Sequence, residues 1–306
     1  MRAAFSEALL ALAKADPRVL LLTGDHGYAL FDSFRRECPD QYINAGIAEQ
    51  NMVGMAAGLA KAGFRPFVYG LSAFVPVRVL EQIKIDVAHD KLPVVFLGDG
   101  AGFVYSHLGT SHQSTEDIAC TRAIPNLAIY SPADRFEMKL CMQMAYAASG
   151  PVYLRMGKSD RGDVHDAPLS DTHAGRWLPL KQGHAAAPVL VATGSMVVTA
   201  LRLTQEAFPQ FSVWSAPCLK PAPAEQIAAL CRNSTCVVTL EEHSVIGGLG
   251  SLVSEIACTM APTRVVRIGV EDRFSEHCGT HAYLLKEHGI DDDSVRHRLE
   301  ALLQGA

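Results

Sequence analysis

The chain has 306 residues, of which 49% are hydrophobic and 19% charged, with a formal net charge of −5. This composition is typical of an α/β protein with buried strands, and the charge offers no basic surface for nucleic acid. No apolar run reaches membrane-spanning length, and the amphipathic start, with Glu7 and Lys14, does not resemble a signal peptide. The eight dispersed cysteines favour reduced thiols and a cytoplasmic protein.

The first half of the chain alternates strands and helices. The hydrophobic pattern predicts a helix over 2–15, strands over 18–23 and 41–44, a buried helix from Glu49, a strand over 65–69, a helix over 75–90, a strand over 92–97, and a helix over 133–147 between strands 127–130 and 151–155. Such alternation predicts a doubly wound, mostly parallel sheet. We assign this first domain to residues 1–158.

A polar, aperiodic stretch over 159–187 predicts a linker across the surface. A second, smaller α/β domain is expected over 188–306. Its predicted strands are 188–192, 211–215, 235–240 and 264–269, and its last helix, 294–303, follows a run of aspartates that suits a helix N-terminus.

The segment from Ile43 to Ala60 is the most informative. Glu49 stands at the entrance of a helix whose next residues are small or apolar, with no further charge before Lys61. A helix that is apolar all round is buried, and its two glycines would let a second backbone come close. The alternative is that Glu49 only occupies the favourable first turn of a helix.

The motif Ile47-Ala-Glu-Gln-Asn-Met-Val-Gly-Met-Ala-Ala-Gly-Leu-Ala60, with a strand before and after it, resembles the pyrimidine-binding domain of thiamine diphosphate enzymes. The resemblance implies that Glu49 hydrogen-bonds the aminopyrimidine ring of the cofactor and exchanges a proton with it. It also implies that Phe74 stacks on this ring, although a core phenylalanine is the alternative. Leu71 stands where the family often has a second aromatic residue.

Asp25 and His26 directly follow the first predicted strand, and we expect both to reach the ligand-binding cleft at its carboxyl end. The resemblance places Asp25 close to the thiazolium ring of the cofactor, while an aspartate in a simple turn is the alternative. Ligands collect at the carboxyl ends of parallel strands, so His26 is a second candidate there.

A glycine-rich loop over 98–112 ends in Thr110-Ser-His-Gln, which resembles the Thr-His-Gln element of transketolases. The resemblance implies that His112 lines the substrate channel, and histidine suits proton transfer to a sugar hydroxyl near neutral pH. Leu108 replaces the aspartate with which transketolases recognise a substrate hydroxyl, and His107 offers a different polar group. A surface histidine is the alternative for both histidines.

Arg155 and Lys158 close the first domain. Transketolases keep a basic residue near the position of Lys158 for the terminal phosphate of the substrate, so both are candidate substrate ligands; a solvated charge is the alternative. Gly98-Asp-Gly resembles half of a diphosphate motif, but Leu127 follows Asn126 where the family has a second asparagine. The resemblance therefore implies that a partner chain holds the diphosphate and Mg²⁺, and we expect no metal ligand in this chain.

In the second domain, Glu241-Glu-His-Ser-Val-Ile-Gly-Gly-Leu-Gly250 resembles the transketolase C-terminal domain, and we expect a structural use of its two acids and histidine. The histidines in Glu276–His281 have metal-like spacing, but no third ligand is evident.

The leading hypothesis is the small subunit of a split, thiamine diphosphate-dependent transketolase. It would transfer a two-carbon ketol unit between a ketose, which we expect to be phosphorylated, and an aldose, after assembly as α2β2 with a diphosphate-binding subunit. The alternatives are the β subunit of a 2-oxo acid dehydrogenase decarboxylase component, which shares the architecture, and a catalytically silent scaffold subunit.

Overall fold

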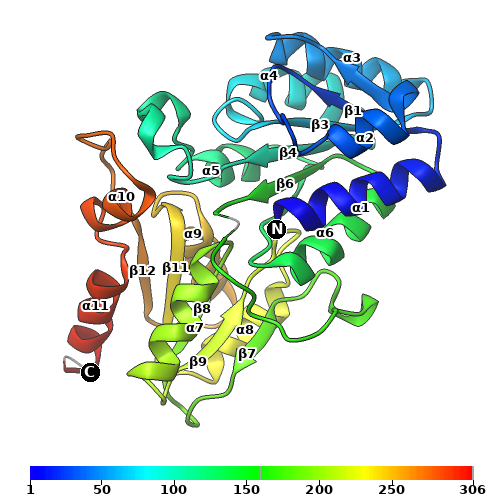
Figure 1. Ribbon diagram of the computed structural model, residues 1–306. Coiled ribbons are helices and arrows are strands. Elements are labelled where there is room, and N and C mark those ends of the chain that lie inside the picture. The colour runs from blue at the N-terminus through cyan, green and yellow to red at the C-terminus, as the bar shows by residue number, and fades with distance from the viewer. Residues whose placement is uncertain (159, 305–306) are drawn as a thin grey trace.

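The computed structural model describes residues 1–158 and 160–304 and has two α/β domains (Figure 1). The predicted linker and second domain each include residues outside this range, namely Ser159 and the terminal Gly305 and Ala306. The helices are α1 (Arg2–Ala15), α2 (Asp32–Glu37), α3 (Glu49–Lys61), α4 (Leu80–Gln82), α5 (Asp117–Arg122), α6 (Arg135–Ala147), α7 (Met196–Glu206), α8 (Ala224–Arg232), α9 (Leu249–Met260), α10 (His281–Glu287) and α11 (Asp292–Gln304).

The strands form two sheets. They are β1 (Val19–Thr23), β2 (Tyr42–Asn44), β3 (Arg65–Leu71), β4 (Val95–Asp99), β5 (Ala128–Tyr130), β6 (Val152–Met156), β7 (Leu178–Lys181), β8 (Val189–Ala192), β9 (Ser212–Ser215), β10 (Cys218–Lys220), β11 (Val237–Ser244) and β12 (Val265–Val270). The first sheet has the order β10-β5-β6-β4-β3-β1-β2 and the second β12-β11-β8-β9-β7. Both are parallel except at β10 and β7, which confirms the predicted doubly wound, mostly parallel architecture.

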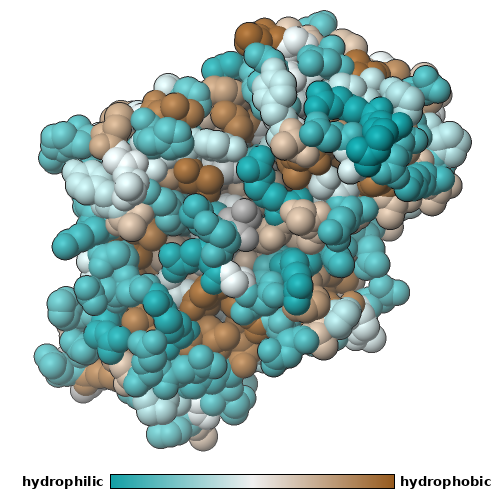
Figure 2. All heavy atoms as spheres, viewed as in Figure 1, coloured by the Kyte–Doolittle hydropathy of each residue, from teal (hydrophilic) through white to brown (hydrophobic). Residues whose placement is uncertain are grey.

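Helices cover both faces of the first sheet. One face packs against α1, α2 and α6, and Figure 1 shows α1 and α6 side by side. On the opposite face the apolar side of α3 packs on β1 and β3, and the same hydrophobic cluster continues to α8 and α9 of the second domain. This continuous apolar layer joins the two domains, because removing apolar surface from water stabilises the folded chain by roughly 25 cal/mol per Å². The surface in Figure 2 is mostly hydrophilic, with apolar side chains in small groups.

Two strands were not predicted. β7 lies inside the predicted linker, so the expectation of an irregular segment is wrong at residues 178–181; Pro179 lies in this antiparallel edge strand, the position in a sheet that tolerates proline. β10 follows the second-domain strand β9 in sequence but pairs with β5 of the first sheet. It has three residues between two prolines, so no alternating pattern signals it.

The predicted helix over 75–90 is not a single α-helix. It consists of a 3₁₀ turn (Val77–Val79), the short α4 and a π-helical segment (Ile83–Ala88). π-helical turns are rare and occur frequently at functional sites. Here the irregular segment directly follows the Phe74 loop.

Candidate active site

The carboxyl ends of parallel strands meet at one edge of the first sheet, and the loops that leave this edge carry the predicted residues. His26 follows β1, Glu49 follows β2 and Phe74 follows β3. His112 lies in a short 3₁₀ turn on the long segment after β4. Residues that are up to 86 positions apart in the sequence therefore come together at this edge.

Four predicted side chains are in contact. The ring centroids of Phe74 and His112 are 5.2 Å apart in an edge-to-face arrangement, and those of Phe74 and His26 are 6.2 Å apart. His26 Nε2 lies 4.0 Å from Glu49 Oε1 and has no hydrogen-bond partner in the described part of the chain. A fifth residue, Arg78, contacts both Glu49 and Phe74. We call Glu49, His26, Phe74, His112 and Arg78 the Glu49 cluster.

Glu49 is the first residue of α3, and only 5% of its surface is exposed. A carboxylate at this position meets the positive end of the helix dipole. Its surroundings are less apolar than the sequence suggested, because Arg78 Nη1 lies 3.2 Å from Glu49 Oε2. The Arg78 guanidinium also lies 3.9 Å from the centroid of the Phe74 ring. Sequence reasoning missed Arg78; its only signal was its place four residues after Phe74.

The expectation that α3 is buried all round is wrong on one face. Met52, Val53 and Ala56 are buried against the sheet. Gly54 is exposed, and a Cβ added to either Gly54 or Gly58 would meet no described atom of this chain within 4 Å. Ile47, just before the helix, is 78% exposed. No segment among the described residues of this chain therefore packs closely against the two glycines, although the sequence pattern allowed a second backbone to do so.

The remaining predicted ligands have other contacts. Asp25 is exposed and accepts a hydrogen bond from the Tyr28 hydroxyl. Leu71 ends β3, and its carbonyl accepts from the backbone N–H of Phe74 at 2.8 Å. His107 is exposed in the turn Ser106–Leu108. Lys158 pairs with Asp160 at 3.1 Å.

Arg155 is not at the cleft, contrary to the expected substrate contact. It is fully buried, its Nε donates to Asp117 Oδ2 at 2.7 Å, and its Nη2 donates to the carbonyl of Glu242 at 2.9 Å. Burial alone would raise the pKa of Asp117, but the charge and hydrogen bond of Arg155 outweigh it and hold this pKa below its ordinary value. The pair ties the first domain to β11 of the second.

The same buried network joins the two loops of the Glu49 cluster. Ser72 Oγ lies 2.9 Å from Ser114 Oγ and 2.9 Å from the Tyr153 hydroxyl. The Tyr153 hydroxyl donates to Asp117 Oδ2 at 2.6 Å. Because Ser72 precedes Phe74 by two residues and Ser114 follows His112 by two, this contact fixes the spacing between the two loops.

The expected structural use of the β11 acids is confirmed. The Glu241 carboxylate accepts from the backbone N–H groups of Leu249 and Gly250 and thereby caps α9. Glu242 accepts from the Phe103 N–H at 2.7 Å across the domain boundary. His243 is fully buried, and this burial lowers its pKa to about 4, so it is neutral at pH 7.

His281, from the segment with metal-like spacing, bonds Glu242 at 2.9 Å through Nε2. In residues 1–158 and 160–304, no three His, Cys, Asp or Glu side chains form a group suited to a metal ion. None of the helices in these residues is long and apolar enough to cross a membrane.

A doubly wound sheet with a buried glutamate at a helix start, beside an aromatic loop at the carboxyl edge, has the features of a pyrimidine-binding domain of a thiamine diphosphate enzyme. The family described as "Transketolase, pyrimidine binding domain" matches residues 1–162, and "Transketolase, C-terminal domain" matches residues 175–295. The chain belongs to the transketolase family of thiamine diphosphate enzymes and is a transferase of the ketol-transfer type.

Relatives match the chain over nearly its whole length. It is 32% identical to one of the subunits of the apulose-4-phosphate transketolase of Phocaeicola vulgatus, over 96% of this chain and 94% of that protein. It is 37% identical to the 1-deoxy-D-xylulose-5-phosphate synthase of Oleidesulfovibrio alaskensis, over 98% of this chain but 48% of that longer protein. A solved structure described as "Split gene transketolase, inactive beta4 tetramer" is 33% identical, with a TM-score of 0.86, over 99% of this chain and 97% of that one.

Proposed function

We propose that this chain is the small subunit of a two-subunit transketolase and contributes half of the active site. The observation that carries the proposal is the Glu49 cluster, in which separate loops bring a buried carboxyl group, an aromatic ring and a histidine together. The match to an apulose-4-phosphate transketolase subunit, along almost the full length of both chains, supports a partner subunit. That protein is named for a sugar phosphate, which supports a phosphorylated substrate here.

The cluster fits the aminopyrimidine ring of thiamine diphosphate. Arg78 shows that a flat group is accommodated there, because its guanidinium both bonds Glu49 and lies over the Phe74 ring. The His26 Nε2 atom, unpartnered among the described residues, is a buried polar atom that a ligand in the same cleft would pair. Glu49 and Phe74 would hold the ring, with Leu71 and Asp25 at the margins of the site.

The cofactor, when bound, supplies the carbon that accepts and releases the ketol unit. Glu49 Oε1 or Oε2 exchanges a proton with the pyrimidine ring. His112 moves a proton to or from a sugar hydroxyl, because imidazole changes charge near neutral pH. His26 and His107 are proposed to bind substrate hydroxyl groups, and the Lys158 ammonium to bind a terminal phosphate.

The partner would hold the diphosphate and Mg²⁺. The exposed α3 face, with Ile47, Gly54 and Gly58, adjoins Glu49 and supports contact with another chain at the active site. The related split-gene structure is a tetramer of one chain type that is described as inactive. We therefore propose a cytoplasmic α2β2 assembly in carbohydrate metabolism in which neither subunit is active alone.

Reconstitution tests this proposal. The purified chain should show no ketol transfer with thiamine diphosphate and Mg²⁺, and mixing it with a subunit that carries the diphosphate-binding domain should restore turnover. The measurement is transfer from a ketose phosphate to an aldose phosphate. Absence of activity in the mixture, together with no cofactor binding, would instead support the silent scaffold.

The same mixture separates the enzyme alternatives by their donor. A 2-oxo acid dehydrogenase decarboxylase component would use a 2-oxo acid and release CO₂. We expect a ketose donor to be consumed without CO₂ release. Turnover with pyruvate alone would contradict the transketolase proposal.

Replacing Arg78 by alanine should tighten cofactor binding. The Arg78–Glu49 ion pair must open before a ring can contact both Glu49 and Phe74, and a partly exposed pair is worth about 1 kcal/mol, or roughly fivefold in affinity. Calorimetric titration of thiamine diphosphate into the two-subunit assembly measures this. Lys84→Ala, which removes an exposed cation six residues after Arg78, should leave the affinity unchanged. Weaker binding in Arg78→Ala would show that Arg78 holds the cofactor.

A further inference from the structure

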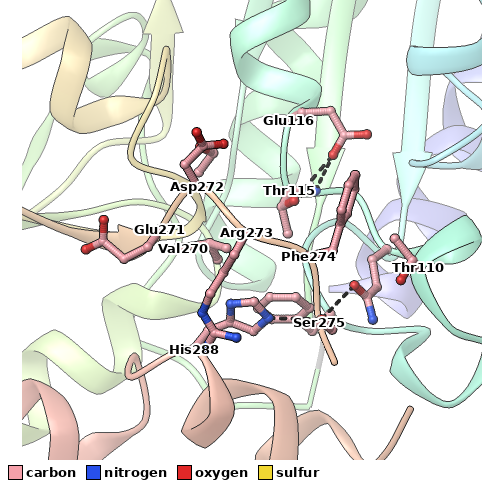
Figure 3. A pocket seen from close by; sticks show the side chains of 13 residues that line it. Thr110, Thr115, Glu116, Val270, Glu271, Asp272, Arg273, Phe274, Ser275 and His288 are labelled. Carbon is pink, nitrogen blue, oxygen red and sulfur yellow. Dashed lines mark hydrogen bonds between the residues drawn. The ribbon is translucent and has the colours of Figure 1, made fainter. Parts of the chain in front are cut away.

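A cavity of about 430 Å³ lies between the two domains, and its lining includes no residue of the Glu49 cluster (Figure 3). Three parts of the chain form its walls: the first domain, the ends of β11 and β12 with the loop after β12, and the residue that follows α10. The lining residues are Phe103, Thr110, Gln113, Thr115, Glu116, Ser244, 270–275 and His288. We call it the interdomain pocket. It opens at the carboxyl ends of β11 and β12, where parallel sheets bind ligands.

Two buried groups in the interdomain pocket have no hydrogen-bond partner among the described residues. Gln113 is 7% exposed with a free Nε2, and His288 is 4% exposed with a free Nδ1. Ser275 Oγ donates to Gln113 Oε1 at 2.9 Å and lies 2.9 Å from His288 Nε2. Because a serine has a single hydroxyl hydrogen, His288 Nε2 is the donor in the second contact.

This chain of hydrogen bonds defines what each group can still offer to a ligand. The Gln113 amide offers two hydrogens, and the His288 Nδ1 atom offers a lone pair. Burial lowers the pKa of His288, and the Arg273 charge lowers it further, so the ring stays neutral and an acceptor. Unpaired polar groups are costly inside a protein, so a ligand that pairs both of them binds favourably.

The charges in the lining disfavour an anion. Glu116, Glu271 and Asp272 outnumber the cation Arg273, whose Nη1 already lies 3.5 Å from the Glu287 carboxylate. Burial raises the pKa of Glu116, even though its carboxylate accepts a hydrogen bond from the Thr115 N–H at 2.8 Å. A phosphate group would meet net repulsion in this pocket.

An aromatic face completes the pocket. Phe274 is 81% exposed and projects from the loop after β12 beside Thr115 and Ser275 in Figure 3. Single exposed apolar side chains are common, but this one lies in the lining of a cavity. The ring offers a flat apolar surface to the C–H groups of a small ligand.

We propose that the interdomain pocket binds a neutral, polyhydroxylated ligand of the size of a free sugar. A hydroxyl group both donates and accepts, so neighbouring hydroxyls satisfy Gln113 and His288 together and bond the carboxylates as donors. This proposal rests on the lining of the pocket and does not depend on the transketolase assignment. Since Gln113 directly follows His112, an occupant also restrains the segment that carries the catalytic histidine.

Titration of the full chain with D-ribose, followed by saturation-transfer NMR, tests the proposal. We expect millimolar binding that Gln113→Leu weakens about tenfold, since one hydrogen bond to a buried donor is worth about that factor. Phe274→Ala should weaken it about fivefold, and its exposed position protects the fold from this change. D-ribose 5-phosphate should bind this pocket at least about fivefold more weakly than D-ribose.

The matched control is Tyr283→Ala, which removes a half-exposed aromatic of α10 that does not line the pocket. It should leave D-ribose binding unchanged. No saturation transfer to D-ribose, or equal transfer in wild type and both pocket variants, would overturn the proposal. Neither the partner subunit nor thiamine diphosphate enters this titration, so failure of the reconstitution assay would leave its result intact.

Discussion

Glu49→Gln is expected to lower the turnover of the reconstituted enzyme by about 10³-fold, within the range of 10² to 10⁴ that general acid–base catalysis contributes. The amide keeps the shape of the carboxyl group but cannot exchange a proton with the pyrimidine ring. Initial rates of ketol transfer at saturating thiamine diphosphate and Mg²⁺ measure the effect.

Two further measurements assign the loss to chemistry. Glu81→Gln, an exposed acid on the neighbouring α4, should keep wild-type turnover. The Glu49→Gln chain should also assemble with the partner and unfold within about 1 kcal/mol of wild type, since it removes one partly exposed ion pair. Turnover above about a tenth of the wild-type rate would exclude proton exchange by Glu49 as the main role.

Arg155→Met is expected to destabilise the chain by about 3–5 kcal/mol, because it leaves the Asp117 carboxylate buried and without its cation. Asp117 Oδ1 already lacks a hydrogen-bond partner among the described residues, so the remaining hydrogen bonds to Oδ2, from Tyr153 at 2.6 Å and from Ser72 at 3.4 Å, cannot offset the loss. The midpoint of urea unfolding, compared with wild type, measures this change.

Lys158→Met is the matched control, since it removes a partly exposed cation three residues away and should change stability by less than about 0.5 kcal/mol. Adding Asp117→Asn to Arg155→Met should recover part of the loss, because the buried charge is then gone. If the Arg155→Met chain were stable and the assembled enzyme had a raised KM for sugar phosphate, the substrate contact expected from the sequence would be supported instead.

The difference between Arg155 and Arg78 shows where sequence reasoning stops. Arg155 lies near the end of the buried strand β6, three residues before the basic Lys158, and nothing local distinguishes a phosphate ligand from a buried ion pair. The distinction depends on Asp117, 38 positions earlier, and on the carbonyl of Glu242, 87 positions later. Arg78 was missed for a related reason, because its contact with Glu49 spans 29 residues and no motif records it.

The local sequence pattern was sufficient to predict the elements whose buried residues form continuous apolar runs or whose ends carry a capping residue. The fully buried strands β1, β4 and β6 appear in the sequence as apolar runs, and Asp134 signals the start of α6 by accepting from two backbone N–H groups of its first turn. The short strands β7 and β10 contain or adjoin prolines and have too few residues for a period to appear. Both were recognisable only from the strands with which they pair.

The sequence by itself determined the doubly wound architecture, the transketolase resemblance, and the local places of Glu49 at a helix start and of Phe74 and His112 on segments that follow strands. These follow from periodicity and from motifs that fix a residue relative to its own strand or helix. The tertiary structure alone decided that Arg78 pairs with Glu49, that Arg155 is buried between the domains, and that Gln113 meets Ser275 across a pocket. Those are contacts between distant segments, and their energies depend on burial and partners that no local pattern contains.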